Sequence, residues 1–169
     1  MIDDHIKSLV NSYKPKGILV DTNILLLWVV GSVNHERIPR FKRTEKFEVE
    51  DYYLLVDFLT SFSKIVTTPN ILTEVNSLVK DIKGDELKRC FEKLAEVFCP
   101  EASIKLEEHY IESIVVTKFK EFHRFGLTDC SILELARNPY LVLTDDFELA
   151  GYLPGCGIDV INFNHLRNI

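Results

Sequence analysis

Residues 17 to 30 read Gly17-Ile18-Leu19-Val20-Asp21-Thr22-Asn23-Ile24-Leu25-Leu26-Leu27-Trp28-Val29-Val30. The first half is a short apolar run that ends in a carboxylate, a pattern typical of a strand covered on both faces, as in a parallel sheet. The oxygens of Asp21, Thr22 and Asn23 suit the free amides that open a helix, which predicts a helix from about Ile24 to Val30. Asp21 is therefore expected at the edge where open α/β sheets bind ligands, either as a helix cap or as a metal ligand.

Strands and helices alternate along the rest of the chain. Short β-branched or apolar runs predict further strands at 65–68, 140–144 and 158–161, and apolar residues at helical spacing predict helices at 3–13, 49–62 and 85–98 and after Pro69. Residues 100–126 are expected to be mostly helical, with Gly126 ending that segment and a new helix opening at Thr128-Asp129. This alternation implies a parallel sheet with helices on both faces. With no repeat and no domain boundary, residues 1–169 are expected to form a single domain.

Composition and charge narrow the functional class. The chain has 169 residues, 46% of them apolar, which suffices for one sizeable core. A net charge of −6 argues against a protein that coats nucleic acid, but it leaves room for a nucleic-acid enzyme with an acidic metal site. The four cysteines form no Cys-x-x-Cys pair, so a zinc site of that kind is unsupported and a reducing cytoplasm is expected. The sequence also predicts no signal peptide and no membrane span.

The segment from Gly31 to Glu50 is strongly basic. It carries aromatic residues between its basic ones, which are Arg37, Arg40, Lys42, Arg43 and Lys46. One interpretation is a loop that meets a phosphate backbone and offers a ring to a base. The other is a solvated linker whose Phe41 and Phe47 pack onto the core, and the segment alone slightly favours this second interpretation.

Several carboxylates follow the predicted strands. Asp21 ends one strand, Asp145 and Asp146 end another, Glu74 follows the strand at 65–68 by less than two helical turns, and Asp129 opens a helix. Taken singly, each aspartate could be a helix cap and Glu74 a solvated helix residue. Together they are expected to converge on one edge of the sheet, where they would repel one another without a counter-ion. A hard cation, Mg²⁺ or Mn²⁺, suits such ligands and can activate water for attack on a phosphodiester.

The order of these motifs resembles that of PIN domains, a family of metal-dependent ribonucleases found as toxins and in RNA processing. The matching pieces are Leu19-Val20-Asp21-Thr22-Asn23, Thr68-Pro69-Asn70-Ile71-Leu72-Thr73-Glu74-Val75, Gly126-Leu127-Thr128-Asp129 and Val142-Leu143-Thr144-Asp145-Asp146. The resemblance implies a three-layer α/β/α sandwich around a mostly parallel sheet of about four to five strands. The segment at 31–50 departs from it, because compact toxin-type members need no such insertion.

The resemblance also implies the roles of individual residues. Asp21, Glu74 and Asp129 would be catalytic metal ligands, with Asp145 or Asp146 as the fourth acid. The family's last motif reads Thr, any residue, Asp, which points to Asp146, although Asp145 lies closer to the strand. Asn23 and Thr144 would assist by hydrogen bonding.

The leading hypothesis is thus a Mg²⁺- or Mn²⁺-dependent endoribonuclease that leaves a 3′-hydroxyl and a 5′-phosphate. The RNA-binding residues would be Arg37, Arg40, Lys42 and Arg43. Three alternatives stay open: the same enzyme as a toxin silenced by an antitoxin protein, a PIN-like scaffold that binds RNA or protein without cutting, and a receiver-like phosphotransfer domain. The last ranks lowest, because no lysine follows Asp146. A homodimer also stays open, since the family often dimerises.

Overall fold

The computed structural model describes residues 4–99, 102 and 105–167. Within these residues five strands form a single sheet in the order β3-β2-β1-β4-β5, and every neighbouring pair is parallel. The strands are β1 (Ile18–Val20), β2 (Ile65–Thr67), β3 (Leu106–Glu108), β4 (Leu141–Thr144) and β5 (Val160–Asn162). The predicted α/β class and the parallel sheet are confirmed.

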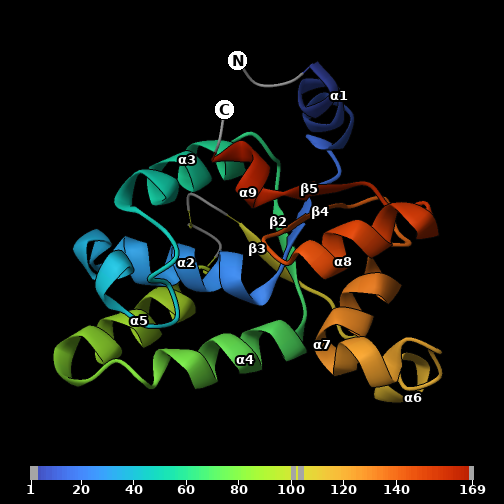
Figure 1. Cartoon of the computed structure of the whole chain (residues 1–169). Coiled ribbons are helices and arrows are strands. Elements are labelled where there is room, and N and C mark those ends of the chain that lie inside the picture. Colours follow the sequence, from blue (N-terminus) through green and yellow to red (C-terminus); the bar gives the residue numbers. More distant parts are fainter. Residues whose placement is uncertain (1–3, 100–101, 103–104, 168–169) are drawn as a thin grey trace.

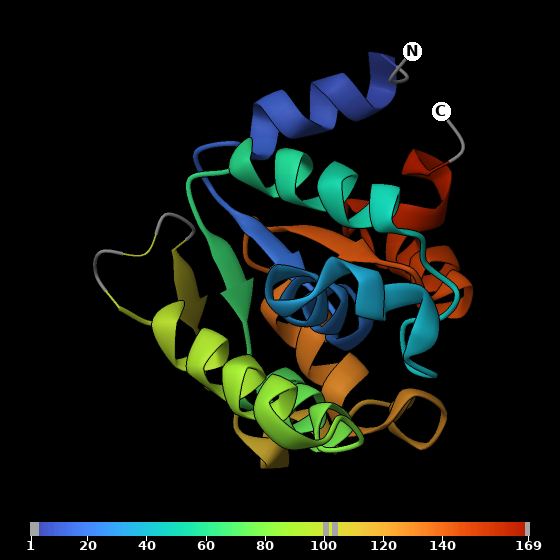
Figure 2. The same cartoon turned by 90° about the vertical axis from the view of Figure 1, so that its left-hand side faces the viewer.

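Helices cover both faces of this sheet (Figures 1 and 2). Those of the described residues are α1 (Asp4–Tyr13), α2 (Thr22–Val33), the 3-10 helix η1 (His35–Arg40), α3 (Val49–Thr60), α4 (Pro69–Val79), α5 (Gly84–Glu96), α6 (Ser113–Val116), α7 (Phe122–Leu135), α8 (Phe147–Tyr152), the 3-10 helix η2 (Leu153–Cys156) and α9 (Phe163–Leu166). Helices α2, α4 and α5 lie on one face, and α7 and α8 lie on the other. The arrangement is the three-layer sandwich that the sequence predicted.

Helix α2 is the centre of the core. Its residues from Ile24 to Gly31 are all buried, and it packs against α3, α4, α5 and η1. A helix that is apolar all round is stable only when it is surrounded in this way. At Gly31 an added Cβ would lie 2.2 Å from the ring of Tyr52, so only glycine allows α3 to approach this closely. The helix is longer than the predicted 24–30, because it begins at Thr22, directly after its cap Asp21, and continues to Val33.

The prediction that residues 100–126 are mostly helical was wrong. The described part of this segment holds the edge strand β3 and the short α6, while residues 100–101 and 103–104 lie outside the described residues. Strand β3 buries only Leu106 and carries charged neighbours, as exposed edge strands commonly do. Gly126, with φ of 73°, breaks α7 at the residue where the sequence predicted one segment to end, just before the helix expected to open at Thr128-Asp129.

The basic segment at 31–50 is an ordered part of the domain. Its first residues finish α2, η1 follows, and Ile38, Phe41 and Phe47 are buried in the core. The prediction that both phenylalanines pack onto the core is confirmed, whereas contact with RNA stays a prediction. Pro39 lies within η1, a 3-10 helix that the sequence analysis did not predict, and the helix continues to Arg40.

Two further predictions concern the redox state of the cysteines and the lack of a membrane span. All four cysteines lie in the described part of the chain, and they are free thiols. None of the described helices combines the length and the apolar character that a membrane span needs.

The strand order reverses between β1 and β4, which lie side by side at the middle of the sheet. The chain leaves β1 toward β2 on one side and leaves β4 toward β5 on the other. In open α/β sheets the loops diverge at such a switch point and leave a crevice at the carboxyl edge. Asp21 and Asp145 are the first residues after these two strands, so they lie at this point.

Candidate functional site

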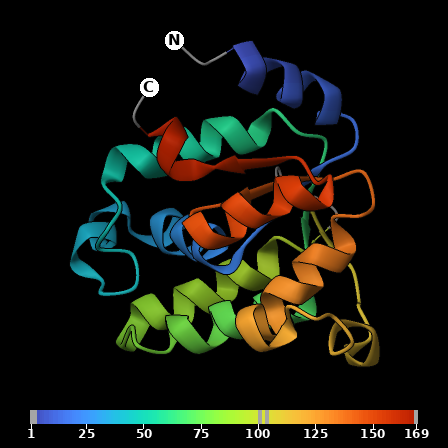
Figure 3. The same ribbon diagram turned by 45° about the vertical axis from the view of Figure 1, so that its right-hand side comes forward.

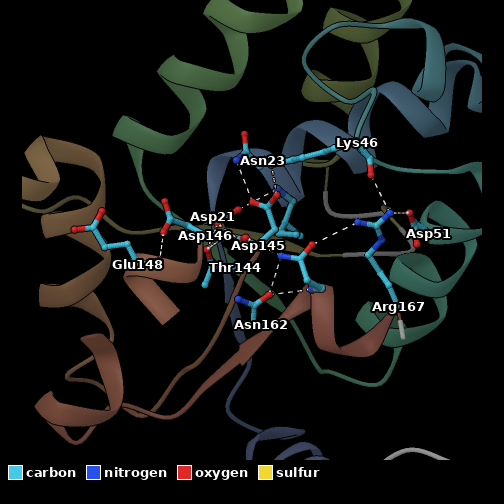
Figure 4. Close-up of polar contacts among 12 residues, drawn as sticks. Asp21, Asn23, Lys46, Asp51, Thr144, Asp145, Asp146, Glu148, Asn162 and Arg167 are labelled. Atoms are coloured by element: carbon cyan, nitrogen blue, oxygen red, sulfur yellow. Dashed lines mark hydrogen bonds and ion pairs between the residues drawn. The ribbon is translucent and has the colours of Figure 1, made fainter. Parts of the chain in front are cut away.

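The predicted acidic residues converge on the switch point from four parts of the chain. Asp21 caps α2 and Asp146 caps α8 (Figure 4), whereas Glu74 belongs to α4 and Asp129 to α7; Figure 3 shows these four helices as ribbons. Thr22 and Thr128, the neighbours of Asp21 and Asp129, both donate to Glu74, and the Asp145 amide donates to Asp21. The carboxylates therefore gather at this edge of the sheet, while their roles as a site stay a prediction.

Asp21 is the most buried member of the cluster. Its Oδ1 accepts a hydrogen bond of 3.0 Å from the Ile24 amide, and its Oδ2 accepts from the Thr144 hydroxyl and, at 3.3 Å, from the Asp145 amide. Burial raises the pKa of this carboxyl to about 7, with repulsion from Asp145 adding to the rise and the Thr144 hydrogen bond opposing it. Near neutral pH, ionised Asp21 is thus a charge that the protein donors leave partly uncompensated.

Asp129 has a similar electrostatic environment on the other side of the crevice. Burial raises the pKa of its carboxyl to about 6, and repulsion from Asp146, Glu74 and Glu148 contributes to the rise. Glu148 was missed by the sequence analysis; it is two residues beyond Asp146 and forms an ion pair with Arg124 of α7. Its place in the first turn of α8 was the available signal, since that turn starts at the predicted site.

Two threonine hydroxyls hold Glu74 in place. Thr22 Oγ1 donates to one of its oxygens at 2.7 Å, and Thr128 Oγ1 donates to the other at 2.5 Å. Both threonines stand next to predicted acids, Thr22 after Asp21 and Thr128 before Asp129, yet the sequence analysis did not assign them a role at the site. They join α2, α4 and α7 through one carboxylate.

Asp145 and Asp146 differ in which of their oxygens are engaged. Asp146 Oδ1 accepts from the amides of Glu148 at 2.6 Å and Leu149 at 2.9 Å, and within the described residues no hydrogen bond reaches its Oδ2. Asp145 is buried; its Oδ1 accepts from Asn23 Nδ2 at 3.0 Å, and its Oδ2 forms an ion pair with Lys46. Asp146 is thus an exposed residue with one oxygen free of these hydrogen bonds, whereas Asp145 is buried among protein groups.

Thr144 and Asn23 lie where assisting residues were predicted. The Thr144 hydroxyl donates to Asp21 and accepts from the Asp146 amide at 3.0 Å, so it links the ends of β1 and α8 (Figure 4). Asn23 instead orients Asp145. Each therefore fixes the direction of a carboxylate at the switch point.

The predicted RNA-binding residues are not part of the cluster. Arg37 pairs with Glu86 of α5 at 2.7 Å, and Arg43 pairs with Asp81, just beyond α4, at 3.0 Å. Arg40 and Lys42 are exposed. Of the basic segment, Lys46 is the residue that the structure places against the acidic site, although the sequence analysis did not assign it to RNA.

The chemistry of the donors fits a hard divalent cation. The groups around the switch point are carboxylate and hydroxyl oxygens, which favour Mg²⁺ or Mn²⁺ over zinc; burial and, second to it, repulsion between carboxylates raise the pKa values of Asp21 and Asp129 there. As the side chains are arranged across the described residues, no three of the type Asp, Glu, His or Cys are close enough to form a ready-made metal cage. Mg²⁺ commonly keeps several of its waters and uses few direct protein ligands.

Comparison with known proteins does not extend this description. No protein-family model, no curated protein and no solved structure matches the chain. The resemblance to PIN domains therefore rests on the motifs quoted above, and what it implies for function is a proposal.

Proposed function

We propose that this protein is a PIN-like endoribonuclease that hydrolyses RNA phosphodiester bonds with Mg²⁺ or Mn²⁺. The observation that carries the proposal is the gathering of carboxylates at the switch point, where burial and mutual repulsion raise the pKa of Asp21 to about 7 and that of Asp129 to about 6. A divalent cation would relieve this repulsion, and it would supply Lewis-acid activation of water and of the phosphate.

The residues that would hold the ion are Asp21, Asp129, Glu74 and Asp146. Asp146 is the better fourth ligand because its Oδ2 is open, whereas the charge of Asp145 is already matched by the Lys46 ammonium group. Thr144 fixes the direction of Asp21, and Thr22 and Thr128 fix that of Glu74, so the carboxylates are oriented before any ligand binds. Such preorganisation is what positions a phosphodiester for in-line attack.

Two partner predictions accompany this proposal through the resemblance alone. One is an antitoxin protein that silences the site, and the other is a homodimer. The RNA target also stays to be found.

The test is cleavage of a panel of single-stranded and structured RNAs in Mn²⁺, in Mg²⁺ and in EDTA. Wild type is compared with Asp21→Asn and Asp146→Asn, and Asp57→Asn, an exposed position on α3, is the matched control. We expect metal-dependent cutting by wild type and the control and its loss in both site variants. If wild type does not cut and metal does not raise its melting temperature, the metal site is refuted and the binding scaffold becomes the leading function.

A further inference from the structure

Lys46 brings a positive charge from the basic segment to the acidic site (Figure 4). Its Nζ forms an ion pair with Oδ2 of Asp145, whose side chain is only 1% exposed, while the Lys46 side chain is 49% exposed. The ammonium group therefore stands at the boundary between the buried end of β4 and solvent.

The backbone of Lys46 is fixed by residues from two other elements. Arg167, just beyond α9, donates from Nη2 to the Lys46 carbonyl at 2.8 Å and pairs with Asp51 of α3 at 2.7 Å. The next residue, Phe47, is fully buried, and its ring lies edge-on to that of Phe163, 6.0 Å away. These contacts fix the backbone at Lys46, from which its side chain reaches Asp145.

The Lys46 ammonium group has more N–H donors than its ion pair with Asp145 can use. A lysine ammonium group carries three N–H donors, and half of this side chain faces solvent. By contrast, the guanidinium groups of Arg37 and Arg43 already donate to carboxylates away from the site.

We propose that Lys46 binds a phosphate group of single-stranded RNA beside the bond that is cut, with Asp145 holding its ammonium in place. The inference rests on the proposed function, because it takes the acidic cluster to be the place of cutting. A carboxylate cluster repels a polyanion, so a fixed cation at its edge gives the strand a point of attachment. In this arrangement Asp145 does not bind the metal ion, because its charge is paired with the Lys46 ammonium group.

The experiment measures RNA binding without cleavage. Proteins carry Asp21→Asn to prevent cutting, and a fluorescein-labelled single-stranded RNA reports binding by anisotropy over about 50 to 200 mM salt. Adding Lys46→Met is expected to weaken binding and to lower the slope of log K against log salt by about 0.7, the value of one phosphate contact on a single strand. Lys46→Arg should keep the slope, and Lys80→Met, an exposed lysine at the end of α4, should leave it unchanged.

A second variant guards against misfolding, because Lys46→Met leaves Asp145 buried without its cation. Lys46→Met combined with Asp145→Asn removes both charges, and it should show the same loss of slope. An unchanged slope in both Lys46 variants, or an equal loss in Lys80→Met, overturns the inference, as does the absence of any RNA binding. If RNA binds with the expected slopes but wild type does not cut it, the phosphate contact of Lys46 stands, whereas the nuclease proposal and the placing of that contact beside a cut bond both fail.

Discussion

The raised pKa of Asp21 makes the stability of the metal-free protein depend on pH. Asp21 is buried, and its pKa is raised from the ordinary 3.8 to about 7. Between these two values the folded protein holds a proton that the unfolded chain has released. Stability therefore falls as pH rises through this window and stops falling above about pH 7.

The size of the effect follows from the shift. Each pKa unit corresponds to about 1.4 kcal/mol, so the complete shift costs about 4 kcal/mol of unfolding free energy. The part of this loss that occurs between pH 3.8 and pH 5 lies outside the practical range. About 3 kcal/mol of unfolding free energy is therefore lost between about pH 5 and about pH 8. Asp21→Asn removes the titrating group but keeps an oxygen that can accept from the Ile24 amide, so helix α2 keeps its cap.

The assay is urea unfolding in EDTA at a series of pH values from about 5 to about 8. Other groups titrate in this range in both proteins, so the informative quantity is the difference between wild type and Asp21→Asn. We expect that difference to shift in favour of the variant by about 3 kcal/mol across the series. Asp57→Asn should run parallel to wild type. If the free energies of unfolding of wild type and Asp21→Asn also changed in parallel with pH, Asp21 would ionise normally. It would then not be the partly uncompensated buried charge on which the metal site depends.

Three further predictions concern the metal, the core and the threonine. Mn²⁺ at about pH 8 should raise the melting temperature of wild type and much less that of Asp146→Asn, and equal shifts would refute the assignment of the fourth ligand. Gly31→Ala should lower the free energy of unfolding by about 1–3 kcal/mol, because its Cβ would meet Tyr52 at 2.2 Å, whereas Gly151→Ala meets nothing within 4 Å and should not. Thr144→Val should lower the free energy of unfolding, measured with urea, by about 1–3 kcal/mol, and it should lower the initial rate of RNA cleavage. Thr144→Ser keeps a hydroxyl and should restore the stability and the rate.

The sequence predicted those parts of the fold in which local pattern and tertiary environment agree. Strand β1 is apolar because both of its faces are covered, and Asp21 caps α2 because the helix starts directly after it. Strand β3 had no such signal. It lies at the sheet edge and buries only Leu106, so its charged residues match a solvated helix as well as a strand. Pairing with β2, a long-range contact, selects the extended form.

The residues of the candidate site also divide into those that local sequence patterns reveal and those that they do not. Asp21, Glu74, Asp129 and Asp146 could be found because each follows a predicted strand or opens a predicted helix. Lys46 could not be found in this way, since it lies about a hundred residues from Asp145 in the chain and nothing in the local pattern links them. Its position depends on how the end of the basic segment packs against α3 and α9, which only the tertiary structure shows.

The way in which charge is compensated separates Asp145 from Asp146, two neighbouring aspartates that the sequence left open as the fourth acid. Asp145 is matched by Lys46 and oriented by Asn23, so it can turn toward a metal ion only by leaving a cation and an amide unpaired. Asp146 accepts from two amides through one oxygen, and no such contact ties its other oxygen within the described residues. We therefore expect Asp146→Asn to lose metal binding even though an aspartate directly precedes it. If Asp145 did substitute, the variant would keep the Mn²⁺-dependent rise in melting temperature, and the division of the cluster into a lysine-bound acid and metal-binding acids would be wrong.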